Sequence, residues 1–299
     1  MRCFRRLGRL ALILAVSGLA LGVASCSRHP EPTWSPPSLS EVRKALTSLP
    51  FGEFVNASAR LHLLRFPQTV TESGLAESLG VRNDRLDDYS ASYLRETAAI
   101  EREILSRLRL YSRSALAAED QATYDAWEKT WADLVARHDV SPALQIFSAG
   151  DDSANARLMR RFAAVDRIVS ENDVVDYIAC LYQAGRQVDQ MRSWLEQAAR
   201  LGTLPERVDL RTALGAMARL RITETYSTSE YLPDRIISAH HPFFAPLRDR
   251  LVEGGFLDAA TRTAHLVDAN RVVERQIIPA YERLARFLAR LLNQMNTAS

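Results

Sequence analysis

Apolar residues recur three and four positions apart along most of this chain, the spacing that places them on one face of an α-helix. One clear instance is the run Tyr124, Trp127, Trp131 and Leu134, whose steps are three, four and three. By contrast, no window alternates apolar and polar residues for long enough to indicate a β-strand. The pattern therefore predicts an all-α fold, a multi-helix bundle of roughly eight to ten helices.

Polar residues and glycines mark where several of these helices begin and end. Ser38, three residues before Glu41, has the spacing of a capping box and predicts the start of the first helix of the bundle. Asn172 or Asp173 is expected to cap a long later helix, and Gly202 is expected to end it. These positions divide the apolar periodicity into separate helices that pack on one another.

The final helix is predicted to begin near Leu257 and to run almost to the C-terminus. Pro279 should kink it, because proline lacks the N–H that a helix interior uses. Apolar residues cluster in its last turns: Phe287, Leu288, Leu291 and Leu292. We expect these residues to form an exposed patch that supports self-association or a protein partner, unless other helices of the domain cover it.

The first 25 residues have a different pattern, an arginine-rich start followed by a twelve-residue, mainly apolar run from Leu10 to Leu21. This run is too short to span a bilayer comfortably and has the length of the apolar core of a signal peptide. Val23, Ala24, Ser25 and Cys26 then match the bacterial lipobox. The pattern predicts cleavage between Ser25 and Cys26 and a lipid on the Cys26 thiol, which would hold the protein on a membrane. The alternative is an ordinary secretory signal with a chance cysteine.

Residues 26–39 contain four prolines and few residues to bury, so they are expected to form an extended tether. Residues 40–299 would then form the helical domain. Ser27 follows the acylated cysteine, at the position where an aspartate is the usual signal for retention in the inner membrane. We therefore expect an envelope protein on the outer membrane that faces the periplasm.

Charge and cysteine content exclude two further classes of protein. Without the four arginines of the leader, which has no acidic residue, 34 basic residues face 36 acidic ones. This balance offers no basic surface for nucleic acid. Cys180 is the one cysteine left after the leader and Cys26, so the mature chain has no internal disulfide and depends on packing for its stability.

The sequence contains none of the common motifs of a catalytic or metal site. It has no His-Glu-x-x-His, no Cys-x-x-Cys and no Gly-x-Ser-x-Gly. We therefore predict no metal, no cofactor and no catalytic residue in this chain. Tyr124, Trp127 and Trp131 could line a ligand groove, but at helical spacing aromatic residues more often belong to the core.

The chain nevertheless resembles a bacterial family, domain of unknown function 885, over about residues 50–290. The resemblance rests on the order and spacing of short matches: Arg65-Phe66-Pro67, Gly74, Gly80, Leu86-Asp87-Asp88-Tyr89-Ser90, Glu119-Asp120, Tyr124-Asp125, Asp176-Tyr177, Val188-Asp189-Gln190, Gly202 to Pro205 with Arg207, Pro242 to Leu247, and Ile278-Pro279-Ala280-Tyr281. Full-length members resemble zinc metallopeptidases, with a His-Glu-x-x-Pro-Gly-His motif in their second half. This chain matches only the N-terminal half, so no catalytic residue is carried over.

The sequence therefore favours a membrane-anchored, non-catalytic helical interaction domain, or a truncated relative of the zinc-peptidase-like proteins. A different hypothesis makes it one half of a split zinc metallopeptidase, with the metal site on another chain. A third makes it a periplasmic small-molecule binding module that uses the face of Tyr124, Trp127 and Trp131.

Overall fold

A computed structural model describes residues 32–147, 153–221 and 240–297, and within them all regular structure is helical. The α-helices are α1 (Leu39–Ala45), α2 (Phe51–Leu63), α3 (Pro67–Glu72), α4 (Ala76–Leu79), α5 (Ala91–Leu108), α6 (Ala118–Ala136), α7 (Pro142–Ile146), α8 (Ala154–Ala163), α9 (Glu171–Leu201), α10 (Arg207–Ala216), α11 (Ala245–Gly254), α12 (Ala259–Val272) and α13 (Ile278–Thr297). In the described ranges nine of them have ten or more residues, so the predicted all-α fold is confirmed. None of the helices described is long and apolar enough to cross a bilayer.

The caps follow the sequence closely, with one exception. Ser38 and Glu41 form the predicted capping box at the start of α1. Gly202, in the left-handed conformation at φ 68°, ends α9 as expected. The predicted start of α9 was wrong: its cap is Ser170, whose hydroxyl accepts a hydrogen bond from the backbone N–H of Asp173 at 3.4 Å. Asp173 is the third residue inside the helix, and its carboxylate returns a bond to the Ser170 N–H at 2.9 Å.

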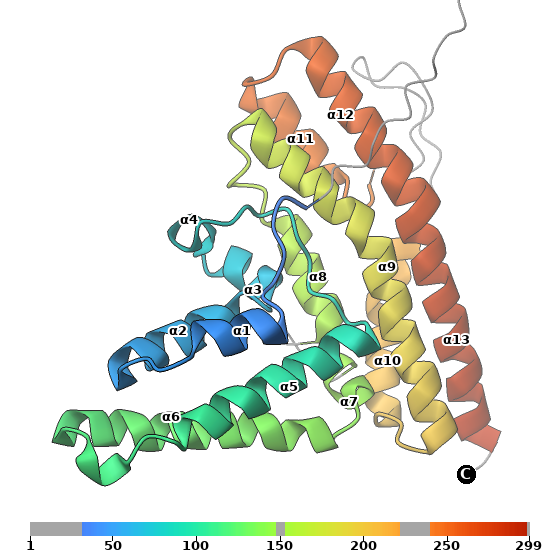
Figure 1. Ribbon diagram of the computed structural model, residues 1–299. Coiled ribbons are helices and arrows are strands. Elements are labelled where there is room, and N and C mark those ends of the chain that lie inside the picture. The colour runs from blue at the N-terminus through green and yellow to red at the C-terminus, as the bar shows by residue number, and fades with distance from the viewer. Residues whose placement is uncertain (1–31, 148–152, 222–239, 298–299) are drawn as a thin grey trace, which may run out of the picture.

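The larger hydrophobic cluster surrounds α9, the longest helix. Figure 1 shows α12 and α13 running along α9, with α10 and α11 beside them. The completely buried residues of the two long helices include Val188, Leu195, Tyr281, Leu284 and Leu288. Helix α9 also lies close to the chain between α12 and α13, where a Cβ at Gly185 would lie 3.0 Å from the carbonyl oxygen of Gln276.

The C-terminal helix is continuous through a π-helical turn, Val273–Ile277, that joins α12 to α13. This turn ends two residues before Pro279, the residue at which the sequence predicts a kink. A π turn is one way in which a helix accommodates a local break in its bonding pattern. The carbonyl oxygen of Gln276 that approaches Gly185 belongs to the same turn, so the irregularity lies at the contact with α9.

The apolar stripe at the end of the chain is not an exposed patch. Leu288 is fully buried, and Leu291 and Leu292 are also buried in the cluster around α9, while Phe287 packs against its edge. Helices α9 and α10 both contact α13. The alternative expectation, that helices of the same domain cover the stripe, is therefore the correct one for these leucines. Self-association through α13 stays a prediction, but an exposed leucine patch no longer supports it.

A second hydrophobic cluster lies between α1, α2, α5 and α6, which project from the first group of helices in Figure 1. Arg65 is only 2% exposed and forms hydrogen bonds between parts of this unit at the end nearest α9. Its guanidinium donates to the carbonyl oxygen of Pro37 at 3.0 Å and to the Thr97 hydroxyl at 2.9 Å, and pairs with Glu96 at 3.0 Å. The arginine thus joins the segment before α1 to α5.

That segment does not behave as a free tether over its whole length. The backbone N–H of Thr33 donates to Asp84 Oδ2 at 2.6 Å, and the indole N–H of Trp34 donates to the carbonyl oxygen of Arg82 at 2.9 Å. In return, Arg85 donates to the carbonyl oxygen of Trp34 at 2.5 Å. The C-terminal part of the predicted 26–39 tether therefore lies on the helical body.

Candidate functional site

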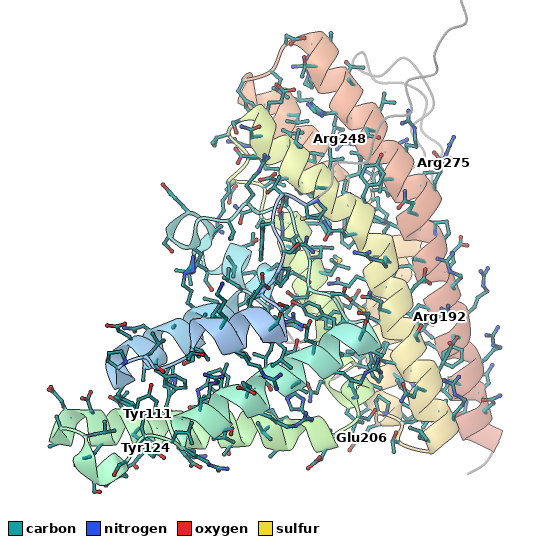
Figure 2. The ribbon with its side chains drawn as sticks, in the orientation of Figure 1. Tyr111, Tyr124, Arg192, Glu206, Arg248 and Arg275 are labelled. Carbon is teal, nitrogen blue, oxygen red and sulfur yellow. The ribbon has the colours of Figure 1, made fainter. Side chains whose placement is uncertain are left out.

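The residues that the sequence predicts to be functional form two groups. Ser25 and Cys26 lie outside the described residues. Tyr124, Trp127 and Trp131 lie on α6 and face the second hydrophobic cluster, with Trp131 only 2% exposed. The Trp127 indole N–H donates to the Ser58 hydroxyl at 3.3 Å, and Figure 2 shows Tyr124 toward the outer end of this unit, away from α9. These rings contribute to the core of the unit, and a ligand role for them stays a prediction.

Polar side chains instead gather where residues 81–90 cross, without helix, from α4 to α5. Extended backbone inside a protein needs hydrogen-bond partners for its N–H and C=O groups. Three glutamines of α9, spaced by four and three residues, provide them: Gln183, Gln187 and Gln190. The amide oxygens of Gln183 and Gln190 accept from the N–H of Leu86 at 3.1 Å and of Tyr89 at 2.9 Å. This face of α9 thus fixes the path of the segment.

Besides Asp84, the segment buries a second acidic residue, Asp87. Its Oδ1 accepts from the backbone N–H of Gln68 at 3.0 Å, near the N-terminus of α3, and the Asp87 N–H donates to Gln68 Oε1 at 3.1 Å. Gln187 donates to the carbonyl oxygen of Asp87 at 2.7 Å. Burial raises the pKa of Asp87 to about 6, although Arg157, 3.6 Å from its Oδ2, opposes the shift. The pair of Gln68 and Asp87 therefore holds α3 against the segment and α9.

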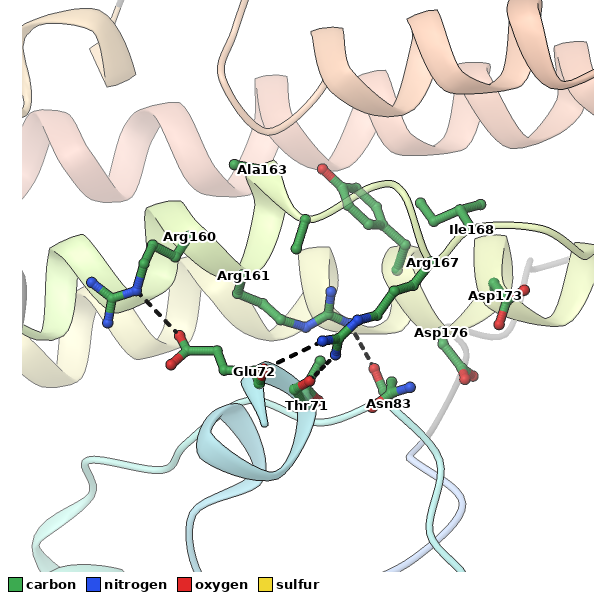
Figure 3. A pocket seen from close by; sticks show the side chains of 12 residues that line it. Thr71, Glu72, Asn83, Arg160, Arg161, Ala163, Arg167, Ile168, Asp173 and Asp176 are labelled. Carbon is green, nitrogen blue, oxygen red and sulfur yellow. Dashed lines mark hydrogen bonds and ion pairs between the residues drawn. The ribbon is translucent and has the colours of Figure 1, made fainter. Parts of the chain in front are cut away.

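A cavity of about 420 Å³ opens beside this polar centre, between α3, the C-terminal end of α8 and the beginning of α9. Figure 3 shows three arginines, Arg160, Arg161 and Arg167, on the wall formed by α8 and the residues after it. Asp173 and Asp176 lie at the end formed by α9. The cavity is therefore lined by charges of both signs.

Most of these charges already have partners. Arg160 lies 3.7 Å from the Glu72 carboxylate, and Asp176 forms an ion pair with Arg82. Arg167 donates to the backbone carbonyl oxygens of Thr71 and Glu72, the latter at 3.3 Å. The arginine after α8 therefore holds the C-terminal end of α3 in place through its carbonyl groups.

Arg161 lies deepest. Its Nη2 donates to the carbonyl oxygen of Asn83 at 2.7 Å and contacts the Sγ of Cys180 at 3.3 Å. Burial raises the pKa of the Cys180 thiol, despite the nearby guanidinium. A buried thiol with a raised pKa is a poor nucleophile, so its environment indicates a packing role.

A third polar cluster joins the helices of the smaller unit. Glu101 on α5 is buried, and its Oε1 accepts a hydrogen bond from His62 Nε2 at 2.8 Å, while its Oε2 contacts His138 Nε2. In the described parts of the chain, no group of three or more histidine, cysteine or acidic side chains has the arrangement to hold a metal ion. The cluster therefore links α2, α5 and the turn after α6 by hydrogen bonds.

Sequence reasoning did not find the polar centre or the cavity. The spacing of Gln183, Gln187 and Gln190 was a usable indication, because it places three amides on one face of a single helix. The adjacent Arg160 and Arg161 gave no such indication of the cavity. Neighbouring helical residues point about 100° apart, and the order of two arginines does not show which of them is buried.

Comparison with known proteins agrees with this fold. The family model described as "Bacterial protein of unknown function (DUF885)" matches residues 67–299. No curated protein matches the chain. A solved structure, described as "the crystal structure of the putative lipoprotein from Colwellia psychrerythraea", aligns with 81% of this chain at 16% identity and a TM-score of 0.60. The alignment covers 41% of that chain, so this protein spans about two-fifths of the length of its structural relative.

Proposed function

The chain belongs to the bacterial family of unknown function DUF885, and from this premise we propose that it is a lipid-anchored protein of the cell envelope. Cleavage after Ser25 exposes Cys26 as the first residue of the mature protein, and its thiol carries the lipid. The helical body is a non-catalytic interaction module. The description of the structural relative as a lipoprotein supports the assignment to the envelope.

The observation that carries this proposal is the docked segment that begins at Thr33. Six residues separate Cys26 from Thr33, so the chain between them reaches at most about 24 Å. The Thr33 N–H and the Trp34 indole are bonded to the body. An anchor at Cys26 therefore holds the helical body near the membrane surface, with the loop around Asp84 on the membrane side.

The chemistry of the cavity supports a non-catalytic role. Its Glu72 and Asp176 carboxylates are paired with arginines, and the Cys180 thiol behind it is buried with a raised pKa. A general base or nucleophile needs a group that is free to exchange a proton with a substrate. These groups are instead engaged in holding α3, α8 and α9 together.

A second function is favoured by the length of the structural relative, of which the alignment covers 41%. On this proposal the helical body is one half of a split zinc metallopeptidase and packs against a separate chain that holds the metal. Zinc content and peptide cleavage of the purified protein distinguish the two. Stoichiometric zinc with cleavage by this chain alone would contradict the non-catalytic proposal, and activity that appears only with a second chain would establish the split enzyme.

Labelling with a palmitate analogue tests the anchor. We expect the wild-type protein to incorporate the label and the Cys26→Ala variant to remain an unlabelled precursor. Cys180→Ala is the matched control, because it removes the other cysteine of the mature chain and should leave labelling unchanged. Equal labelling of wild type and Cys26→Ala would refute the assignment.

Membrane fractionation tests the location. We propose that Ser27 directs the protein to the outer membrane, where it faces the periplasm. The Ser27→Asp variant should then move to the inner membrane while it keeps its lipid. An unchanged distribution between the two membranes would contradict the proposed role of this position.

A further inference from the structure

Arg161 is a buried cation without an anionic partner in the described residues. Only 5% of it is exposed, and its two hydrogen-bond partners are the carbonyl oxygen of Asn83 and the Sγ of Cys180. No carboxylate among the described residues forms an ion pair with it, and its Nε has no hydrogen-bond partner there. A buried charge is costly unless it is paired, so this arrangement needs an explanation.

Among the described residues, none of the carboxylates near Arg161 forms an ion pair with it. Glu72 pairs with Arg160 at 3.7 Å, and Asp176 pairs with Arg82. The Asp173 carboxylate accepts from the Ser170 N–H at the start of α9. The buried Asp84 accepts from the Thr33 N–H at 2.6 Å through Oδ2, while its Oδ1 has no hydrogen-bond partner in the described residues. The local acidic residues therefore do not supply the missing counter-charge.

Arg161 lines the cavity of about 420 Å³, a volume within the usual range of small-molecule sites. Arg161 is bonded to Asn83, and Arg167 is bonded to Thr71. Both guanidiniums therefore lie on the side of the cavity that is formed by α3 and Asn83 (Figure 3). Further along, the lining is apolar, with Ala164, Ile168 and the Tyr177 ring. One end thus suits an oxyanion, and the remainder suits a hydrocarbon body.

We propose that this cavity binds a small organic carboxylate. The carboxylate pairs with the guanidinium charge of Arg161, whose Nη2 stays bonded to Asn83 and Cys180, and the apolar part of the ligand lies against Ala164, Ile168 and Tyr177. Glu72, Asp173 and Asp176 at the rim favour a single negative charge over the double charge of a phosphate. The proposal depends on neither the anchor nor the absence of catalysis.

Titration calorimetry of the full chain in detergent tests the proposal with a series of straight-chain carboxylates from propionate to hexanoate. We expect saturable binding at one site, with affinity that rises about threefold to fourfold for each methylene that enters the apolar part. Inorganic phosphate and butyl phosphate are the comparison, and both should bind more weakly than butyrate. Tighter binding of either phosphate than of every carboxylate would overturn the choice of ligand.

Three variants locate the site. Arg161→Gln removes the charge and should weaken hexanoate binding at least tenfold. Ala164→Leu narrows the cavity and leaves Arg161 unchanged, because Ala164 is an exposed residue of the cavity wall. This variant therefore tests the site even if the buried arginine is needed for folding. Arg109→Gln is the control: this exposed arginine pairs with Glu128 in the smaller unit.

The expected result is a clear loss of affinity in both cavity variants and none in the control. Thermal unfolding of each variant shows whether it is folded. The proposal is overturned if no carboxylate in the series binds saturably, or if Ala164→Leu, folded as well as the wild type, binds hexanoate with unchanged affinity.

Discussion

Replacement of Leu288 by alanine tests whether α13 packs as the structure shows. Leu288 is fully buried in the cluster around α9, on a helix whose last turns had been expected to form an exposed patch. Removal of a buried leucine side chain loses its transfer free energy and leaves a cavity. Such changes cost about 2.7–5.0 kcal/mol. We expect Leu288→Ala to lower the free energy of unfolding by about 3–4 kcal/mol, because the site lies between two long helices that cannot easily collapse onto it.

Urea unfolding followed by far-UV circular dichroism measures this loss. At an m-value of about 3 kcal/mol per molar, a loss of 3–4 kcal/mol lowers the midpoint by about 1 M. Leu110→Ala is the matched control, since Leu110 is 83% exposed and its truncation should change the free energy of unfolding by less than about 0.5 kcal/mol.

A loss below about 1 kcal/mol for Leu288→Ala would refute the packing of α13 on α9. Sedimentation of the same two proteins gives a second readout. If α13 is covered by its own domain, wild type and variant should show the same oligomeric state, whereas a partner surface at Leu288 would weaken self-association in the variant.

Three further predictions follow from individual contacts. Burial alone would raise the pKa of Glu101, but hydrogen bonds and charge interactions with His62 and His138 together outweigh it and lower this pKa. The contribution of Glu101 to stability is therefore present at neutral pH and is lost as pH falls through this lowered pKa. Glu101→Gln should therefore cost about 1–3 kcal/mol at pH 7 and progressively less toward pH 3 in urea titrations; a pH-independent difference would contradict this. Cys180 should react with a thiol reagent only when urea unfolds the chain, because its thiol is buried and its pKa raised; fast reaction in buffer would show an open site. Gly185→Ala should lower the melting temperature, because the new Cβ would lie 3.0 Å from a backbone oxygen. We expect the resulting strain to exceed the gain in helix propensity of about 1 kcal/mol. A higher melting temperature would show that the π turn can move.

The apolar periodicity and the caps were sufficient to predict the helical fold, but they do not show which surfaces meet. The spacing of Leu288, Leu291 and Leu292 correctly indicates one apolar face of α13. Periodicity describes a helix in isolation, so it cannot distinguish a face covered by α9 and α10 from one that awaits a partner. The same limit applies to Tyr124 and Trp131: their spacing defines the inner face of α6, and only the positions of α2 and α5 show that this face is core.

The polar centre was harder to predict, because its partners are distant in the sequence. Gln68 and Asp87 are 19 residues apart, and Gln187 reaches Asp87 across 100 residues. Each is an unremarkable polar residue in its own segment. Their role follows from the non-helical path of residues 81–90, whose backbone groups require bonds from neighbouring helices.

The same short segment also connects the N-terminal end of the body with the cavity. Arg82 and Asp84 hold Trp34 and Thr33, while Asn83, between them, accepts the hydrogen bond from Arg161 at the cavity wall. The carbonyl oxygen of Arg82 accepts from the Trp34 indole and that of Asn83 accepts from Arg161, so one stretch of backbone serves both surfaces. The segment that leads to the proposed anchor and the guanidinium that lines the cavity are therefore positioned by consecutive residues. A substitution that displaced this stretch would alter both surfaces, whereas a change in the aromatic core of α6 should affect neither.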